Sequence, residues 1–422
     1  MNLQTQKKIT LFAISGVMSA FAAAGCSSAD ESGSADSLEL NVGSAFAQSG
    51  DLASMGQSAD KASYIGADIV NKAAKEADIK FKVKVFSEDT QGQPAQASEA
   101  ATKLIQSDKA SVIVGPQSTA ETIPMTLSVG VPNQVPQIAM ASSTAIGGVK
   151  DGGYLFRTVP SDLSQAKILV DVVTDELGAD ATVNLGARND PAGSGFLNAF
   201  EKAWEKGGGT VGKLVKWNPS QQGSYDTEAQ QLASGNPDGW VLYDFEGTWL
   251  KFEPALVRTG KWDPRRSFGG DPLGELPKDL AKEAVGMRGL FIGAKEGPQL
   301  TAFNDLWKKE AGGLEQIYAE PQTFDAVILA SLAALKGGDT DGATIKENLT
   351  AVSKAPGKKY DWTQLSEAMT AVQNGDDIDY EGASGGIDFD EQGDPSSAFY
   401  TVWEWQAGGE LKVGNSVGGS VK

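Results

Sequence analysis

Two hydroxyl-rich turns are the first segments of this chain whose residue types and positions could do chemistry. The apolar run 111–114 leads into residues 115–121 (GPQSTAE), and the run 137–140 leads into residues 141–145 (ASSTA). A hydroxyl group that opens a helix after a strand lies beside free backbone N–H groups and the positive end of the helix dipole. Each turn can therefore hold an anion such as a carboxylate.

Each turn also has a purely structural interpretation. Ser118 or Thr119 can bind a ligand carboxylate, or Ser118 can simply cap a helix, with Glu121 completing a capping box. The turn with Ser142 and Ser143 can equally be a polar loop. Open α/β sheets bind ligands beyond the carboxyl ends of their strands, so the two turns together favour a binding site more than either alone.

Acidic segments add two further candidates. Asp271 follows a possible strand and can pair with a ligand cation, although aspartates are common in loops. Residues 388–394 (DFDEQGD) faintly suggest a calcium loop but lack its full spacing, and we interpret them as a turn. We therefore predict no metal site.

The composition argues against an enzyme. The chain has no histidine, which removes the usual imidazole base, the Ser-His-Asp triad and most zinc and iron sites. Residues 193–195 (GSG) lack the lysine and spacing of a phosphate-binding loop, and no Gly-x-Ser-x-Gly elbow occurs. We predict a protein without catalytic residues or cofactors.

The N-terminus resembles a bacterial lipoprotein signal. Lys7 and Lys8 precede an apolar stretch that is too short for a comfortable membrane span, and small residues then lead into Cys26, the only cysteine. We predict that residues 1–25 are a signal peptide and that Cys26 is lipidated, which anchors the protein to the membrane outside the cytoplasm. The alternative is an ordinary signal peptide with an incidental cysteine.

Composition also suggests how the rest of the chain is organised. Residues 26–37 contain no large apolar residue before position 38, and we expect a flexible tether. The remaining length is typical of two lobes rather than one small core. The full chain has 36 basic and 55 acidic side chains and a net charge of −19, which argues against nucleic acid as a partner.

Strand and helix patterns alternate along most of the chain, which predicts parallel sheets with helices on both faces. The predicted strands are residues 38–42, 81–85, 111–114, 137–140, 181–185, 240–245 and 289–292. The predicted helices are residues 57–76, 95–107, 163–177, 196–204, 302–309 and 321–335. Residues 191–195 read as a Gly-rich turn and residues 399–413 as a hairpin.

The ordered set of segments resembles the type I periplasmic binding proteins, and within them the branched-chain amino acid (Leu/Ile/Val) receptors of ABC transporters. The matching stretches are residues 43–50 with Gly56, 113–118, 141–144, 154–162, 323–326 and 386–394. The resemblance implies an α/β fold of two doubly wound lobes that close on a ligand, joined by three crossovers near Thr158, Ala294 and Gly385. Lobe 1 is then residues 38–158 and 295–385, lobe 2 is residues 159–294 and 386–415, and residues 416–422 form a tail.

The resemblance also implies the ligand contacts. The two hydroxyl-rich turns hold the ligand's α-carboxylate and amine, and a carboxylate of lobe 2 neutralises the ammonium. The corresponding positions here are Ser118, Thr119, Ala141, Ser142, Ser143 and Thr144, with Asp271 as the carboxylate. Family members often have a tyrosine after the strand at 240–245, where this chain has Phe245 and Glu246. Met55 borders the pocket, and loops near Trp249 and Phe324 can contribute to specificity.

The resulting hypothesis is a lipid-anchored receptor that delivers an amino acid to the permease of an ABC importer. Its partners are a small-molecule ligand, the permease subunits and, through the lipid, the membrane. Two alternatives stay open at this point. The ligand can instead be an amide, urea or an aromatic carboxylate, or the protein can be a sensor that works with a membrane signalling protein.

Overall fold

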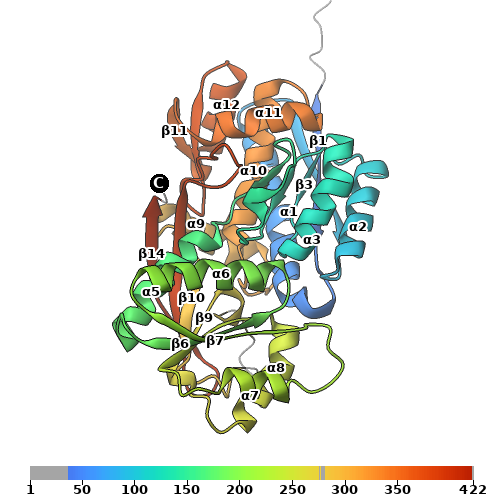
Figure 1. Cartoon of the computed structure of the whole chain (residues 1–422). Coiled ribbons are helices and arrows are strands. Elements are labelled where there is room, and N and C mark those ends of the chain that lie inside the picture. Colours follow the sequence, from blue (N-terminus) through green and yellow to red (C-terminus); the bar gives the residue numbers. More distant parts are fainter. Residues whose placement is uncertain (1–36, 275, 277–280, 421–422) are drawn as a thin grey trace, which may run out of the picture. The chain divides into compact units, whose positions relative to one another are not determined.

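The computed structural model describes residues 37–274, 276 and 281–420. The predicted signal peptide, Cys26 and nearly all of the tether lie outside the described residues. Two large sheets, each covered by helices on both faces, dominate the described chain, and the chain passes between them three times (Figure 1). The predicted fold class is therefore confirmed. Within the described ranges, no helix is both long and apolar enough to cross a membrane.

The first sheet is parallel, with the strand order β2-β1-β3-β4-β5. Its strands are β1 (Leu38–Phe46), β2 (Phe81–Asp89), β3 (Val112–Val114), β4 (Gln137–Ala139) and β5 (Leu155–Arg157). The helices around it are α1 (Ala53–Glu76), α2 (Pro94–Gln106), α3 (Thr119–Met125), α4 (Val131–Asn133), α10 (Glu320–Gly337) and α11 (Gly342–Ser353).

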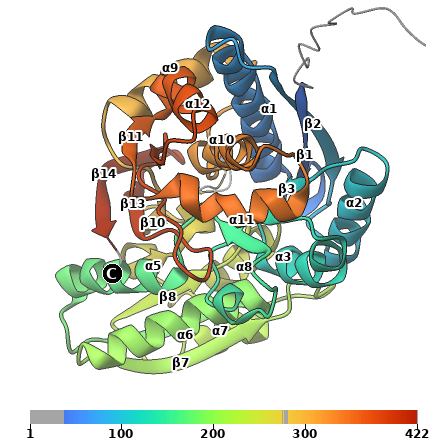
Figure 2. The same cartoon turned by 90° about the horizontal axis from the view of Figure 1, so that it is seen from above.

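Side-chain alternation along the strands explains why helices cover both faces of the first sheet. Val112 and Val114 belong to the core formed with α1 and α10, whereas Ile113 packs with residues of α2 and α3. A strand that is buried on both faces reads as a continuous apolar run, which is how residues 112–114 appear in the sequence. Figure 2 shows α1 and α10 on one side of β1 and β3, and α2 and α3 on the other.

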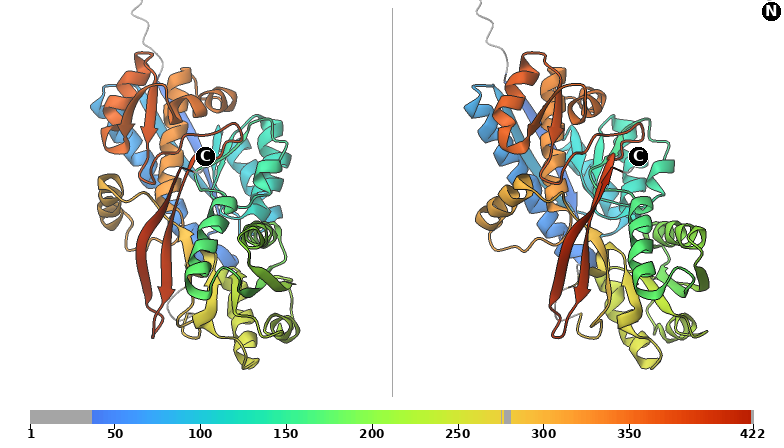
Figure 3. Two further views of the ribbon diagram at one scale, coloured as in Figure 1. Left: turned by 60° about the vertical axis from the view of Figure 1, so that its left-hand side comes forward. Right: turned by 90° about the vertical axis from the view of Figure 1, so that its left-hand side faces the viewer.

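The second sheet has the strand order β14-β13-β10-β9-β8-β6-β7. Its parallel strands are β6 (Thr182–Arg188), β7 (Thr210–Trp217), β8 (Gly239–Tyr243), β9 (Ser267–Gly269) and β10 (Arg288–Ile292). The antiparallel hairpin of β13 (Ser397–Trp405) and β14 (Leu411–Ser420) lies at its edge (Figure 3). Its helices are α5 (Asp162–Leu177), α6 (Pro191–Lys206), α7 (Asp226–Leu232) and α8 (Glu246–Arg258).

Two sequence predictions need correction here. Residues 191–195 are the first turn of α6 rather than a separate turn, because Pro191 fits the first helical position and Asp190 accepts a hydrogen bond from Gly193 N. Residues 416–420 continue β14 rather than forming a tail. Their glycines and serines gave no strand signal, and pairing with β13 decides their conformation.

The passages between the sheets follow β5, follow β10 and precede β13. Between the second and third passages lie α9 (Pro298–Glu310), α10, α11, α12 (Leu365–Gln373) and a small sheet of β11 (Lys358–Asp361) and β12 (Ile378–Glu381). The third passage is displaced from the predicted position. Phe389 packs edge-on against Phe156 of β5, so the chain stays with the first sheet beyond Gly385 and leaves it near Pro395. The exact lobe boundaries stay a prediction.

Candidate ligand-binding site

The strand ends bring the predicted site residues into buried positions. Ser118 follows β3, residues 141–143 follow β4, and Phe245 and Asp271 follow β8 and β9. All eight predicted ligand contacts are 0–7% exposed, namely Met55, Ser118, Thr119, Ala141, Ser142, Ser143, Phe245 and Asp271. The carboxyl ends of parallel strands therefore supply both halves of one candidate site.

The turn after β4 contacts the second half of the molecule directly. Ser143 Oγ donates to the carbonyl oxygen of Pro191, the first residue of α6, over 2.8 Å. Asp162 N, at the start of α5, donates to the carbonyl oxygen of Ser142 over 2.8 Å. Ser142 and Ser143 thus lie where the helices of the second sheet meet the strand ends of the first.

Arg157, which the sequence analysis used only as a family marker, fixes this turn. Its Nη1 atom donates to the carbonyl oxygens of Ala141, Ser142 and Ser143 at 3.4, 2.9 and 3.1 Å. Its Nε and Nη2 atoms form a bidentate pair with Asp394, and the side chain is 1% exposed. A charged side chain at the end of an apolar strand was the signal that could have identified it.

The acidic segment 388–394 has a structural role. Asp390 Oδ1 accepts hydrogen bonds from the backbone N–H groups of Gln392 and Asp394, and the Asp394 carboxylate pairs with Arg157. Across the described ranges, no group of three or more acidic or cysteine side chains could hold a metal ion. The segment is a turn, as interpreted from its spacing.

Ser118 adopts the structural alternative considered above. Its hydroxyl group donates to Glu121 Oε2 over 2.6 Å and accepts from Glu121 N over 3.4 Å, so Ser118 caps α3, while the Glu121 carboxylate binds the Ser118 hydroxyl group and not the backbone N–H of a full capping box. Burial raises the pKa of Glu121 to about 7, and the hydrogen bond from Ser118 opposes this rise. Ser118 is therefore engaged by its own helix in this structure.

Asp271 is the predicted partner of a ligand cation, and it is only 1% exposed. Gln165 Nε2, from α5, donates to Asp271 Oδ1, but no donor in the described chain is in hydrogen-bonding geometry with Oδ2. Burial raises the pKa of Asp271 well above its ordinary value, and the nearby charge of Asp162 adds to this rise.

Asp162 is a second buried carboxylate beside Asp271, and sequence reasoning missed it. It is 0% exposed, and the Ser142 hydroxyl is a donor close to its carboxylate, although no hydrogen bond of regular geometry forms with the described residues. Burial raises its pKa to about 6, while the Ser142 hydroxyl and the Arg157 guanidinium oppose the rise. The sequence analysis included Asp162 in the matching stretch 154–162. An aspartate at the start of a helix is common, however, so the pattern did not indicate a binding role.

Tyr243 and Tyr400 lie close to the two carboxylates, and Tyr318 lies close to Tyr243. The hydroxyl of Tyr400 in β13 donates to the carbonyl oxygen of Ser161, and that of Tyr318 donates to the carbonyl oxygen of Met140. Burial, followed by the charges of Asp162 and Asp271, raises the pKa of Tyr243 at the end of β8 well above its ordinary value. We call Asp162, Gln165 and Asp271, with the surrounding Tyr243, Tyr318 and Tyr400, the acidic cluster.

Phe245 and Glu246 point to different neighbours. Phe245 is buried, and the Arg188 guanidinium lies 4.5 Å from the centre of its ring. Glu246 Oε2 instead accepts a hydrogen bond from Ser54 Oγ of α1 over 2.8 Å, which is a second contact between the halves. Asp190 and the buried Asp244 both form ion pairs with Arg188, so the cation beside Phe245 already has two partners.

Trp249 and Phe324, named above as positions near specificity loops, belong to helices and to the hydrophobic cores. Both are 0% exposed. Trp249 packs with Phe252 in α8, and Phe324 packs with Phe303 and Trp362. The helical pattern at residues 321–335 placed Phe324 correctly, whereas Trp249 lay in no predicted element, and only packing shows that both face away from solvent.

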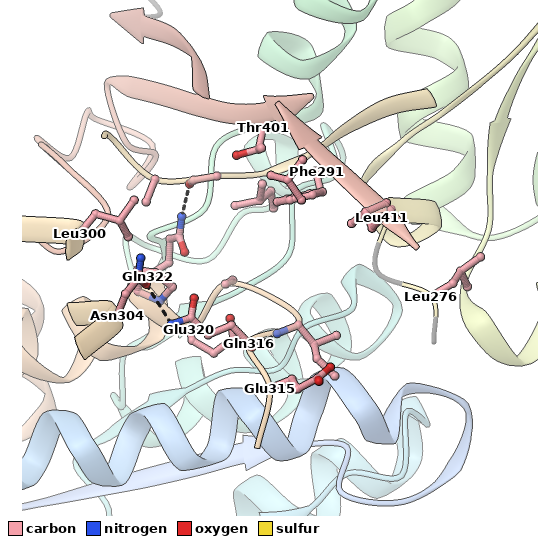
Figure 4. A pocket seen from close by; sticks show the side chains of 18 of the residues that line it. Leu276, Phe291, Leu300, Asn304, Glu315, Gln316, Glu320, Gln322, Thr401 and Leu411 are labelled. Atoms are coloured by element: carbon pink, nitrogen blue, oxygen red, sulfur yellow. Dashed lines mark hydrogen bonds between the residues drawn. The ribbon is translucent and has the colours of Figure 1, made fainter. Parts of the chain in front are cut away.

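A separate cavity of about 510 Å³ lies beside the passages between the sheets (Figure 4). β10, β14 and the start of α10 contribute Phe291, Leu411 and Gln322 to its wall, and Gln322 Nε2 donates to the carbonyl oxygen of Gly293. None of the eight predicted ligand contacts lines this cavity. The candidate site and this cavity are therefore different places in the described structure.

Comparison with known proteins agrees with this architecture. The family model described as "Periplasmic binding protein" matches residues 39–400, and the chain belongs to that family. Membership implies an extracytoplasmic protein that binds a solute, in a family of binding proteins rather than enzymes.

Two curated relatives illustrate the range of the family. The Leu/Ile/Val-binding protein homolog 3 of Brucella melitensis is 25% identical over 383 residues, which cover 89% of this chain and 94% of that protein. The chemotactic signal transduction system substrate-binding protein BasB of Halobacterium salinarum is 23% identical over 334 residues, covering 77% of each chain.

Solved structures establish the fold. The branched-chain amino acid transporter substrate-binding protein LivJ of Streptococcus pneumoniae, in complex with isoleucine, superposes with a TM-score of 0.70 at 20% identity and covers 90% of this chain and 99% of that one. A solute-binding protein of an ABC transporter from Rhodopseudomonas palustris, in complex with p-hydroxybenzoic acid, gives a TM-score of 0.69 at 18% identity, with 90% and 96% covered.

Proposed function

We propose that this protein is the receptor of an ABC importer and that it binds an amino acid and delivers it to the permease. The observation that carries the proposal is Asp271, a carboxylate that is 1% exposed and has one oxygen without a donor in the described chain. An unpaired buried charge is costly, by several kcal/mol per ion. A ligand ammonium group would supply both the opposite charge and the missing donor.

The hydroxyl-rich turns are the proposed partners of the ligand's carboxylate. Ser118 and Thr119 open α3, and residues 141–143 lie at the neighbouring strand end. In the structure the hydroxyl groups of Ser118 and Ser143 are held by Glu121 and by the Pro191 carbonyl. We propose that both exchange these partners for a ligand when it enters, because a hydrogen bond to a carboxylate is stronger than one to a neutral acceptor.

We also propose that the two halves close on the ligand. The contacts of Ser143 with Pro191 and of Ser54 with Glu246 support this proposal, because each joins the two halves. Small-angle scattering should show a smaller radius with bound ligand than without it. Binding at saturation without any change, by a protein shown to be open when ligand-free, would contradict closure.

The cellular placement is a separate proposal that rests on the sequence. Residues 1–25 act as the signal peptide, lipidated Cys26 is the anchor, and residues 26–37 are the tether. Cys26→Ser should release soluble or unprocessed protein. Correctly processed protein that stays in the membrane fraction would contradict the anchor.

An aromatic carboxylate is the second candidate ligand, and one observation favours it. The Arg188 guanidinium lies against the Phe245 ring at the end of β8, which places a cation and an aromatic face side by side. Such a pair can hold the carboxylate and ring of a benzoate. A sensory role, as the name of the Halobacterium relative suggests for that protein, is compatible with either ligand.

A thermal-shift screen of amino acids, benzoates, amides and urea separates these ligands. A true ligand at a hundredfold excess over its dissociation constant stabilises the folded protein by about 2.7 kcal/mol. Stabilisation by amino acids alone supports the proposal, and stabilisation by benzoates alone contradicts it. Genes for a permease and an ATPase beside this one would favour transport over sensing.

A further inference from the structure

Three segments that are far apart in the chain meet at the Arg157 guanidinium. The first is the turn after β4, whose carbonyl oxygens at residues 141–143 accept from Nη1. The second is the end of β5, to which Arg157 belongs and after which the first passage between the sheets begins. The third is the turn 390–394, where the Asp394 carboxylate accepts from Nε and Nη2 at 2.6 and 2.5 Å. One buried side chain therefore connects the candidate ligand-binding turn with the first and third passages.

The turn that carries Asp394 is fixed to the first sheet by its backbone. Arg157 N donates to the Gly393 carbonyl oxygen over 3.0 Å. Gly393 has a φ of +76°, and a Cβ atom on it would lie 2.6 Å from the Leu155 carbonyl oxygen, so this close contact requires a glycine. Beyond Asp394, only residues 395–396 precede β13 of the second sheet. Asp394 therefore lies where the third passage leaves the first sheet.

We propose that Asp394 is a positioning residue for ligand binding, which couples the turn at residues 141–143 to the third passage through Arg157. This inference rests on the proposed function, because it assumes that the turn holds a ligand. Asp394 has no hydrogen bond to this turn within the described chain, and its effect passes through the guanidinium.

The guanidinium can transmit a displacement because its geometry is rigid. It is planar and holds its N–H donors in a fixed fork, so the direction of Nε and Nη2 toward Asp394 also sets the direction of Nη1. The Arg157 side chain is 1% exposed, which leaves water little access to replace either partner. The Ser142 carbonyl oxygen also accepts from Asp162 N, at the start of α5. The turn is thus held between Arg157 and the second half of the molecule.

Asp162 gives the guanidinium an alternative partner. Its buried carboxylate is near enough to Arg157 for the two charges to interact, although no hydrogen bond of regular geometry joins them. Asp394 prevents this exchange by holding the fork with two hydrogen bonds. Without the Asp394 carboxylate, we expect the guanidinium to turn toward Asp162 and to release carbonyl oxygens of the turn.

Titration calorimetry tests the effect on affinity, with L-isoleucine and p-hydroxybenzoate as the probes. We expect Asp394→Asn to weaken the probe that the wild-type protein binds by roughly two- to thirtyfold, as for other couplings carried by a network of contacts. The Asp394 side chain is 20% exposed, so its replacement leaves no cavity in a core. Asp394→Glu keeps the charge and should recover part of the affinity.

Asp60→Asn is the matched control for a general loss of stability. The Asp60 carboxylate also belongs to the first half and accepts from two side chains, the Ser44 and Ser87 hydroxyl groups, both at 2.6 Å. Its replacement should lower the free energy of unfolding in urea but leave the affinity of the folded protein unchanged.

Hydrogen exchange measured by mass spectrometry tests the positioning itself. In the ligand-free protein, Asp394→Asn should speed exchange at residues 140–146 and leave residues 38–114 unchanged. Because coupling between two places is reciprocal, a bound probe should slow exchange at residues 390–396 of the wild-type protein and have less effect there in Asp394→Asn.

The outcomes separate this inference from the proposed function. Wild-type affinity in Asp394→Asn, with unchanged exchange in the turn, overturns the inference and leaves the receptor function intact. An equal loss of affinity in Asp60→Asn also overturns it, because the effect is then one of general stability. If neither probe binds the wild-type protein, the proposed ligands fail, and exchange in the ligand-free turn decides: faster exchange in Asp394→Asn supports the inference and unchanged exchange overturns it.

Discussion

Asp271 and Asp325 are both buried carboxylates, but the folded chain supplies them with different numbers of hydrogen-bond donors. Asp325, in α10, is 0% exposed and accepts hydrogen bonds from Tyr380 Oη, Ala383 N, Ser384 N and Ser384 Oγ at 2.6–2.9 Å. Asp271 accepts one side-chain hydrogen bond, from Gln165, and its Oδ2 atom has no donor in the described ranges. The folded chain therefore supplies donors to both oxygens of Asp325, whereas one oxygen of Asp271 receives none from the described residues.

Donor saturation separates a structural carboxylate from a binding carboxylate in this chain. Burial raises the pKa of Asp325 to about 6, and its hydrogen bonds oppose this rise. Burial raises that of Asp271 well above 3.8, with Asp162 adding to the rise. Asp325 holds residues 383–384 in the part of the chain that stays with the first sheet, and Asp271 lies at a strand end where the halves meet.

The largest expected effect is on stability. Asp325→Ala should lower the free energy of unfolding by about 3–5 kcal/mol, because it leaves several buried donors without an acceptor. Urea unfolding measures the loss. Asp325→Asn keeps part of the network and should lose less, and a loss below that of Asp325→Asn would contradict the assigned role.

The next effect is on binding. Asp271→Ala should weaken the binding of an amino acid by roughly 30-fold or more, since the loss of one partner of a buried charge pair costs about 2–5 kcal/mol. Its ligand-free melting temperature should equal or exceed that of the wild-type protein, because an unpaired buried carboxylate is removed. Titration calorimetry and thermal unfolding check the two halves of this prediction. An equal affinity would favour an uncharged or purely anionic ligand.

A pH dependence of stability follows from the same contrast. Burial raises the pKa of Asp271 well above 3.8 and that of Asp244 to about 7, so both bind a proton more tightly in the folded chain than in the unfolded one. Such groups contribute stability at low pH that is lost as the pH rises through their folded pKa. We expect a higher melting temperature at pH 5.5 than at pH 8 and a smaller difference in Asp271→Asn. An unchanged difference in this variant would contradict the raised pKa.

The smallest expected effect concerns the contact between the halves. Ser143→Ala removes the hydrogen bond to the Pro191 carbonyl and should weaken ligand binding by about 0.5–1.5 kcal/mol, or roughly two- to tenfold. The unfolding free energy should change little, because the hydroxyl group of Ser143 fills no core position. Glu246→Gln is the matched control, since it retains an acceptor for Ser54 at the other contact. An equal loss of affinity in both variants would mean that Ser143 has no special role.

The sequence predicted local structure well because local structure depends on neighbouring residues. The apolar alternation at residues 38–42 and the buried run at 112–114 fixed two strands of the first sheet, and the helical spacing of residues 57–76 placed most of α1. The sequence also indicated that Ser118 caps α3, with Glu121 as its partner three residues later. The ordered segments were enough to indicate the family, which the match over residues 39–400 confirms.

The site depends on pairs that are far apart in the chain. Gln165 and Asp271 are separated by 106 residues, Ser54 and Glu246 by 192, and Arg157 and Asp394 by 237. A loop aspartate gives the same local pattern whether its oxygens are filled by the chain or left open. Asp162 was concealed for the same reason, because a helix-opening aspartate is common.

Hydrophobic patterning and composition predicted many of the alternating α/β elements, the lack of histidine chemistry and the strand ends at which polar groups gather. Hydrophobic periodicity and local capping encode these features within a few residues. The contacts formed on folding show that the described residues saturate Asp325 but not Asp271, that Asp162 lies beside Asp271, and that residues 416–420 extend a sheet. Whether a buried polar group is satisfied depends on what packs against it, and folding alone brings those groups together.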